Sequence, residues 1–278
     1  MLTNRDWSKN LTAVSVALMI FAALSDQLAF SVEVAKTNSK PLKYEEPRVL
    51  AGRIYAKGGD GKNLLFNFSR RATRNGAALQ VLREYTHPDG KLAARERVSY
   101  HGDNLVSYEL EELQIGARGR AGIRRDQAAP AKGRIQFEYS NNAGFDGKPN
   151  TDSESLQKET LINDMVGPFL ASHWDALIRG HSVKCRFIVV PRTETVGFTF
   201  RKGSESKWEG RKVIVIKMAA TSPVIAALVD PIFFKVEMNE PHRVFTYEGR
   251  TTPKIKAGGK WKDLDALTVF DWEQSTLH

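Results

Sequence analysis

The chain has 278 residues, of which 41% are hydrophobic and 26% charged, a composition that excludes wholesale disorder. With 41 Lys and Arg against 32 Asp and Glu, the formal net charge is +9. This charge favours an anionic partner, such as a lipid or lipopolysaccharide headgroup or an acidic protein, although solubility alone also explains it. The single cysteine, Cys185, excludes an intrachain disulfide and a cysteine-rich zinc site.

The N-terminal residues have the pattern of an export signal. Arg5 and Lys9 precede an uncharged segment, residues 10–25, whose apolar centre is residues 14–24. Ala29 and Ser31 are small residues at the two cleavage positions. The pattern predicts a signal peptide over residues 1–31, a periplasmic or otherwise exported protein, and a flexible lead-in over 32–47. An uncleaved membrane anchor is the alternative interpretation.

From residue 48, hydrophobic and polar residues alternate with the period of a β-strand. The turns between the segments contain glycine, as in Asn75-Gly76 and in Asp89-Gly90, where glycine tolerates a positive φ. The pattern predicts an antiparallel meander of strands at residues 49–57, 64–73, 77–86, 92–100 and 104–113.

A basic segment then interrupts the alternation. Residues 116–133 combine glycine, alanine and proline with arginines, and are expected to form a loop before a strand at 134–140 and a second loop at 141–150. If the protein is exported, the natural counter-charge is an anionic lipid or lipopolysaccharide rather than nucleic acid. The arginines proposed as contacts for such a surface are Arg118, Arg120, Arg124 and Arg125. A loop without a dedicated partner is the alternative.

The central part of the chain is expected to be helical. Thr151-Asp-Ser-Glu154 has the spelling of a capping box, and apolar residues follow at roughly helical spacing. Because Pro168 suits the first turn of a helix better than its interior, we expect two helices, at 153–166 and 168–178, within a helical insert at 152–180.

Strand patterns resume after the insert. They are at residues 183–190, 195–201, 211–219, 232–238 and 243–247, with a short helix at 222–229 and a wrapping tail at 252–278. The expected fold is therefore mainly β: one domain, residues 48–278, built as a large curved antiparallel sheet (a half-barrel) of about 11 strands around a central helical segment. A β-sandwich is the alternative.

This order of elements resembles the periplasmic lipoprotein carriers (LolA/LolB-like) and related uncharacterised exported domains. Residues 177–184, which lead into a strand, and Tyr247-Glu-Gly249, which close one, also fit such domains. The resemblance implies a concave apolar face, partly plugged by helices, that can hold an acyl chain or a peptide. It assigns no individual residue.

The polar residues show no catalytic or metal pattern, so we predict no catalytic residue, no metal and no cofactor. His173 and His181 are eight residues apart, which does not suit a shared metal site on one helix. Glu109, Glu111 and Glu112 are expected at a strand end, with Glu109 and Glu111 on one solvated face, and Cys185 is expected in the core.

The largest apolar set near the insert is expected either to fill the core or to line a pocket. Its members are Phe169, Trp174, Leu177, Val224, Ile225, Leu228, Phe233 and Phe234. The predicted function is an exported, non-catalytic protein that binds an apolar or amphiphilic ligand in a concave sheet face. The alternatives are an envelope adaptor that binds another protein and a hydrolase of an envelope polymer. No nucleic-acid partner is expected, and the oligomeric state stays open.

Overall fold

The computed structural model describes residues 44–58, 61–126, 128, 132–141 and 148–276. These residues belong to one compact unit. The predicted signal peptide with its cleavage site and most of the predicted lead-in lie outside the described residues. None of the helices in the described part has the length and apolar character needed to cross a bilayer.

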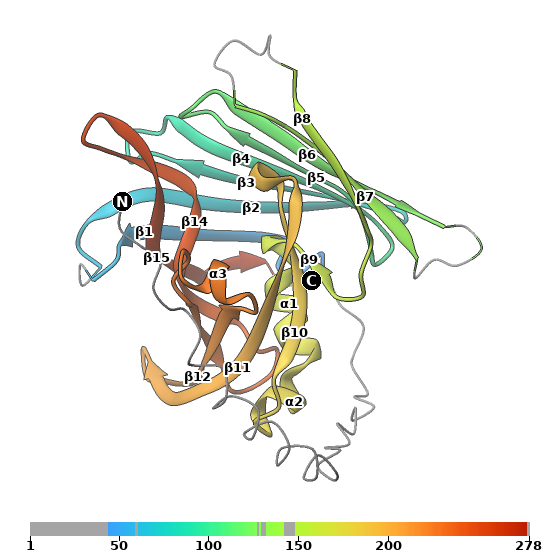
Figure 1. The fold of residues 1–278 in the computed structure, drawn as a ribbon. Coiled ribbons are helices and arrows are strands. Elements are labelled where there is room, and N and C mark those ends of the chain that lie inside the picture. The colour runs from blue at the N-terminus through green and yellow to red at the C-terminus, as the bar shows by residue number, and fades with distance from the viewer. Residues whose placement is uncertain (1–43, 59–60, 127, 129–131, 142–147, 277–278) are drawn as a thin grey trace, which may run out of the picture. The chain divides into compact units, whose positions relative to one another are not determined.

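The described residues form a sheet of fifteen strands with a few short helices (Figure 1). The strands of the first half are β1 (Val49–Ala56), β2 (Leu64–Asn75), β3 (Ala78–Thr86), β4 (Leu92–His101), β5 (Asn104–Glu112), β6 (Ala117–Arg125), β7 (Gly133–Ser140) and β8 (Asn150–Ser155). Those of the second half are β9 (Thr160–Leu161), β10 (Val183–Val189), β11 (Glu194–Trp208), β12 (Arg211–Ala220), β13 (Ile232–Glu237), β14 (Val244–Ala257) and β15 (Lys260–Thr276). The helices are η1 (Asn163–Met165), α1 (Val166–Ser172), α2 (Trp174–Ile178), η2 (Val190–Arg192) and α3 (Pro223–Ala226).

The chain passes through the sheet as two meanders that start and finish at its centre. The first runs from β1 out to β8 at one edge, and the second runs from β9 and β10 at the other edge back to β15, which pairs with β1. Neighbouring strands are antiparallel except β9 and β10, which are parallel. The predicted fold class, one large curved antiparallel sheet with few helices, is confirmed, with fifteen strands in place of about eleven.

Contacts between the two halves close the curved sheet on itself. Glu154 of the edge strand β8 accepts hydrogen bonds from the backbone N–H (3.0 Å) and the hydroxyl of Thr195 in β11, and Arg186 of β10 lies 3.9 Å from its carboxylate. Nearby, Val190 of η2 packs over Gly119 of β6, where an added Cβ would clash. The two ends of the sheet are therefore joined by side chains rather than by a strand ladder.

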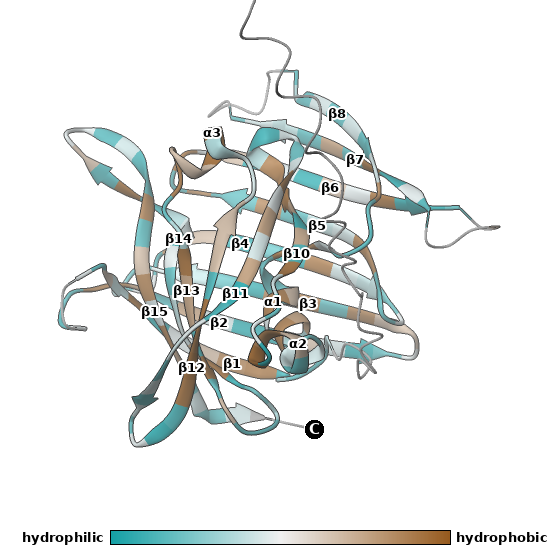
Figure 2. Ribbon diagram, turned by 60° about the horizontal axis from the view of Figure 1, so that its bottom comes forward, coloured by the Kyte–Doolittle hydropathy of each residue, from teal (hydrophilic) through white to brown (hydrophobic). Residues whose placement is uncertain are grey.

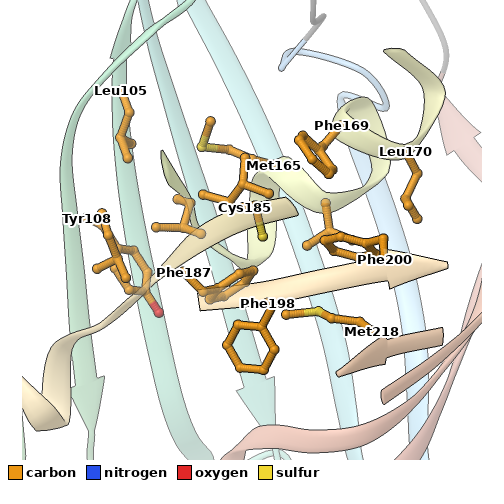
Figure 3. Packing of buried hydrophobic residues seen from close by; sticks show 14 of the residues in the cluster. Leu105, Tyr108, Met165, Phe169, Leu170, Cys185, Phe187, Phe198, Phe200 and Met218 are labelled. Carbon is orange, nitrogen blue, oxygen red and sulfur yellow. The ribbon is translucent and has the colours of Figure 1, made fainter. Parts of the chain in front are cut away.

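The helical segment from η1 to α2 lies inside the curve and is part of the core. One buried cluster combines residues of β3–β7, of β9–β14 and of the η1–α2 segment, including Phe169, Leu170 and Leu177, which are completely buried. Figure 2 shows the alternating hydropathy along the strands that produces this inner face. Figure 3 shows Phe169 of α1 beside Phe200 of β11, with ring centres 5.3 Å apart, and Tyr108 facing Phe187 across the core. Cys185 is buried in the same cluster, and burial raises the pKa of its thiol to about 12.

The predicted helix at 153–166 is wrong. Residues Asn150–Ser155 form β8, and helical structure begins only at Asn163. The capping-box residue Glu154 does not cap a helix, because its carboxylate bonds to Thr195 across the closure of the sheet. The helix predicted at 168–178 is present as α1 and α2, with Gly167 and Pro168 in the first turn of α1.

The predicted loop at 116–133 and the predicted tail at 252–278 are also wrong. Residues Ala117–Arg125 form β6, in full register between β5 and β7. Most of the tail belongs to a long hairpin, because β14 continues to Ala257 and β15 returns from Lys260 to pair with both β14 and β1. Gly258 and Gly259, at φ +60° and +76°, form its turn.

The end of the predicted flexible lead-in, residues 44–47, is held in the structure. Tyr44 is buried and stacks on Tyr100 of β4, with ring centres 4.6 Å apart. The carbonyl groups of Tyr44 and Pro47 accept hydrogen bonds from the Arg70 guanidinium. Because these hydrogen bonds go to backbone carbonyl groups, which every residue has, the sequence of residues 44–47 does not reveal them.

Candidate functional site

A cavity of about 480 Å³ lies between α1 and the inner faces of β1–β3 and β13–β15. Much of its wall is aromatic: Phe68, Trp174, Phe234, Tyr247, Phe270 and Trp272. The rings pack on one another, with Phe68 and Phe270 at 5.6 Å and Phe234 and Tyr247 at 5.4 Å between ring centres. A cavity of this size, with an aromatic part and a charged part to its wall, is suited to a small molecule.

The helical wall of the cavity is made of small residues. Val166, Gly167, Pro168 and Ala171 of α1 line it. A Cβ added at Gly167 would meet no atom within 4 Å, so the space beside this turn is open. The cavity remains open beside this turn because Gly167 has no side chain, and a larger residue there would fill part of the space.

One buried ion pair fixes α1 against the sheet. Arg70 of β2 donates to both carboxylate oxygens of Asp164 in η1, at 2.7 and 3.2 Å, and Tyr100 donates to the same carboxylate at 2.9 Å. Burial by itself would raise the pKa of Asp164, but Arg70, together with Arg83 and the Tyr100 hydroxyl, outweighs burial and lowers it. Because both side chains line the cavity or its entrance, the pair connects the helical wall to the strand wall.

A second buried network lies in the strand wall. Arg83 of β3 donates through Nη1 to Glu96 of β4 at 2.6 Å, and Glu96 also accepts from Tyr85 (3.2 Å) and Thr252 (2.5 Å). Burial opposes the charge of Arg83, yet the neighbouring Glu96 raises the pKa of the guanidinium. Arg83, Tyr85 and Thr252 line the cavity, so its polar part is built from β3 and β14.

Two further arginines line the cavity from β14 and the loop before it. Arg250 is engaged by carboxylates, at 2.9 Å from Asp265 and 2.7 Å from Asp263. Arg243 has its nearest carboxylate, that of Glu237, at 3.8 Å and lies over the ring of Trp272 at 5.8 Å. The N–H groups of Arg250 are therefore used by carboxylates at short distance, whereas those of Arg243 are not.

The structure does not bring the eight residues of the predicted pocket together. Trp174 and Phe234 line the cavity, whereas Phe169 and Leu177 are completely buried in the core. Phe233 is half-buried and points to the opposite face of β13 from Phe234. Ile225, Val224 and Leu228 belong to the α3 segment: Ile225 packs against the core, and the other two are 71% and 70% exposed.

The sequence contained a signal for the polar lining that the prediction did not use. Arg83 has the strand phase of Val81 and Tyr85, and Arg70 has the phase of Phe66 and Phe68. A charged residue in the inward phase of a strand must find a partner inside the sheet. This phase predicts buried ion pairs, although it does not identify Asp164 as the partner.

The four predicted surface arginines lie on two faces of β6. Arg118, Arg120 and Arg124 are exposed on the outer face, and Arg125 is half-buried on the inner side. Glu109 of β5 lies 3.8 Å from Arg120 and opposite it in register. The arginines therefore share their strand face with carboxylates, and their contact with an anionic surface stays a prediction.

His173 of the insert packs against the core rather than facing a second histidine. Its ring lies 4.3 Å from that of Phe169 between ring centres, with the two planes tilted by 37°. Trp174, next to it in the chain, stacks on His242 at 4.2 Å. Within the described ranges, no group of three or more His, Cys, Asp and Glu side chains could hold a metal ion.

Comparisons with known proteins identify no family for this chain. No family model matches the sequence, and no curated protein matches it. Among solved structures, the chain is similar to a beta-barrel-like protein of a domain of unknown function, DUF1849, from Brucella abortus. The identity is 9%, the TM-score is 0.36, and the match covers 80% of this chain and 94% of that chain. A likeness of this degree supports no inference about function, and the resemblance to the lipoprotein carriers stays a prediction.

Proposed function

We propose that this protein is an exported, non-catalytic binding protein that holds an apolar or amphiphilic ligand, such as a lipid acyl chain, in the cavity beside α1. The observation that carries the proposal is the cavity itself, about 480 Å³ with an aromatic wall. Ligand pockets in proteins have volumes of roughly 300–1,000 Å³. The space is therefore sufficient for an acyl chain.

The position of the cavity supports a carrier rather than a filled structural domain. In a well-packed core, space of this size would be occupied by side chains, because protein interiors are packed about as densely as organic crystals. Here the α1 turn with Gly167 and Ala171 leaves the space open. The N-terminal residues Arg5 and Lys9, followed by the apolar segment, support export, and the resemblance to the LolA/LolB-like carriers supports a lipid ligand.

The buried carboxylates near the cavity support binding rather than catalysis. Asp164 accepts hydrogen bonds from Arg70 and Tyr100, and Glu96 accepts from Arg83 and Tyr85. A general acid or base must be able to exchange a proton with a bound substrate. Two carboxylates that are each held by an arginine and a tyrosine are better suited to a structural role.

A substitution that fills the cavity tests the proposal. In Gly167→Phe the new ring enters the open space beside α1, so we expect displacement of an apolar fluorescent probe, measured by titration, to be largely lost. The matched control is Gly122→Phe in β6, outside the cavity lining, where an added Cβ meets only Arg120 Nε at 4.0 Å.

Two results would count against binding in this cavity. One is a wild-type protein that binds neither the probe nor any long-chain lipid. The other is Gly167→Phe protein that binds the probe as tightly as Gly122→Phe does.

A further inference from the structure

We propose that the ligand of this cavity is an amphiphile with an anionic group, a carboxylate or a phosphate ester, that is bound by the guanidinium groups of Arg243 and Arg83. This inference rests on the proposed function and adds the chemical class of the ligand. The argument depends on which arginine N–H groups in the cavity wall already have an acceptor, and not on the net charge of the wall. The wall contains four arginines and four carboxylates, so net charge alone does not favour an anion.

Two of the four arginines have their donors used by the protein. Arg70 donates to Asp164 and to the carbonyl groups of Tyr44 and Pro47. Arg250 donates to Asp263 and Asp265 from both sides of its guanidinium. These two side chains connect parts of the wall, and most of their N–H groups are already used within the protein.

The other two arginines have donors without partners. A guanidinium has five N–H groups. The hydrogen bond of Arg83 uses Nη1 alone, and neither its Nε nor its Nη2 has a hydrogen-bond partner among the described residues. The guanidinium of Arg243 makes no hydrogen bond to a described residue, and its ion pair with Glu237 is 3.8 Å long. The Nε atoms of both side chains are enclosed by protein atoms, so the Nη atoms are the donors that a ligand can reach. Guanidinium groups in such surroundings are normally hydrogen-bonded in native proteins, so these donors call for an acceptor.

The carboxylates of the wall do not satisfy these donors. Asp164 is held by Arg70, Glu46 and Glu240 have interactions of their own, and Asp175 is exposed on α2. Oε2 of Glu237 is a buried carboxylate oxygen without a hydrogen-bond partner among the described residues, but it lies 3.8 Å from Arg243 and outside the cavity lining. An oxyanion from a ligand in the cavity would supply a closer acceptor. Carboxylates and phosphates match the planar guanidinium, which can bind either group through two parallel hydrogen bonds.

Both arginines also lie against the aromatic wall. The guanidinium carbon of Arg83 is 5.3 Å from the ring centre of Phe68, and that of Arg243 is 5.8 Å from the ring centre of Trp272. A ligand bound at these cations would place its next atoms on the aromatic side chains. This adjacency favours a molecule that has an anionic head and an apolar chain.

Binding of four soluble probes, measured by isothermal titration calorimetry, tests the inference. Dodecanoate, dodecyl phosphate and dodecanol share one alkyl chain and differ in the head, and inorganic phosphate has no chain. We expect the two anionic amphiphiles to bind about tenfold or more tightly than dodecanol, and Arg243→Met to remove most of this difference. Binding of dodecanol itself should change little in that variant.

Two further variants separate charge from fold. Arg201→Met is the matched control, because Arg201 is exposed on β11 and outside the cavity lining, and it should bind all probes as the wild type does. Arg243→Lys keeps the positive charge and should retain part of the preference for anionic heads. The relative affinities of dodecanoate and dodecyl phosphate then show which anion is preferred.

The outcomes distinguish this inference from the proposed function. Equal affinity for dodecanol and both anionic amphiphiles, unaffected by Arg243→Met, would overturn the inference and leave the apolar cavity standing. Absence of binding by every probe with an alkyl chain would overturn the proposed function. If inorganic phosphate bound as tightly as dodecyl phosphate, the alkyl chain would contribute nothing to binding. The site would then be one for a free anion and not for an amphiphile.

Discussion

At the scale of single residues, the buried pair of Arg70 and Asp164 connects the first half of the sheet to the helical segment. The side chains are 6% and 1% exposed, so neither charge is stabilised by water. The pair also holds Tyr44 and Pro47 through the Arg70 donors. Loss of either partner leaves an uncompensated buried charge, which is far more costly than loss of a surface pair.

Asp164→Asn should therefore destabilise the protein by about 3–5 kcal/mol. The measurement is the free energy of unfolding in urea. Glu109→Gln is the control: it breaks the ion pair with Arg120, whose two side chains are 42% and 56% exposed, and should cost less than about 1 kcal/mol. Similar costs for the two substitutions would show that the buried pair does not hold α1 in place.

The same pair predicts how stability depends on pH. Burial raises the pKa of Asp164, but Arg70, together with Arg83 and the Tyr100 hydroxyl, outweighs burial and makes the folded-state pKa lower than usual. Such a carboxyl stabilises the fold at pH values above its unfolded pKa of about 3.9, and this contribution is lost as pH falls through the folded pKa. Between about pH 5 and pH 3, the unfolding free energy of the wild type should fall more steeply than that of Asp164→Asn. Parallel curves for the two proteins would contradict this assignment.

At the scale of elements, the structure depends on the place where η2 meets β6. A Cβ at Gly119 would lie 2.7 Å from the carbonyl oxygen of Glu138 and 2.7 Å from Cδ2 of Tyr139, and closer still to Val190. Real Cβ atoms do not approach other atoms so closely. The glycine therefore permits the two ends of the sheet to meet.

Gly119→Ala should destabilise the protein by roughly 1–3 kcal/mol, the usual cost of overpacking a core. Gly122→Ala, three residues further along the same strand, should change the unfolding free energy little, because its Cβ would meet only Arg120 Nε, at 4.0 Å. Chemical denaturation of both variants is the measurement. If Gly119→Ala were as stable as Gly122→Ala, the close packing of η2 on β6 would be wrong.

The elements that the sequence predicted correctly are those whose signals are local. The hairpin between β2 and β3 is an example, since Gly76 adopts the positive φ, +59°, that its turn chemistry requires. The inner faces of β3 and β13 follow from the period of their apolar residues. Turn residues and alternation depend on a few neighbouring positions, and both can be read from a single chain.

The elements that were predicted wrongly are those held by contacts with residues far away in the sequence. Glu154 looks like a helix-cap residue, but its acceptor groups are used by Thr195, forty-one positions away. In β15, charged residues such as Lys262 and Asp263 obscure the alternation, while the backbone pairs with β1 and β14 on both sides. Tertiary hydrogen bonds override local propensity in such segments.

The candidate site was predictable only in outline. A concave apolar face was expected near the insert, and Trp174 and Phe234 do line the cavity. The inward strand phase of Arg70 and Arg83 indicates buried ion pairs in the polar part of the wall, but no local pattern identifies their partners in η1 and β4. Val224 and Leu228 were included because apolar residues are expected inside, yet the short α3 segment leaves them exposed.

At the scale of the whole described unit, the pairing of β1 with β15 joins the two meanders into one sheet. The helical segment η1–α2 connects β9 to β10, lies inside the curve and is packed by both halves. The cavity lies beside this segment, between α1 and the strands at the centre of the sheet. We propose that an amphiphilic ligand occupies this space.

Native mass spectrometry of gently purified protein measures this occupancy directly. Wild-type protein and the Gly122→Phe control should each retain a bound lipid, detected as an added mass that is released on collisional activation, and Gly167→Phe should not. A wild-type spectrum without any adduct, or an identical adduct on Gly167→Phe, would show that no ligand is held in this cavity.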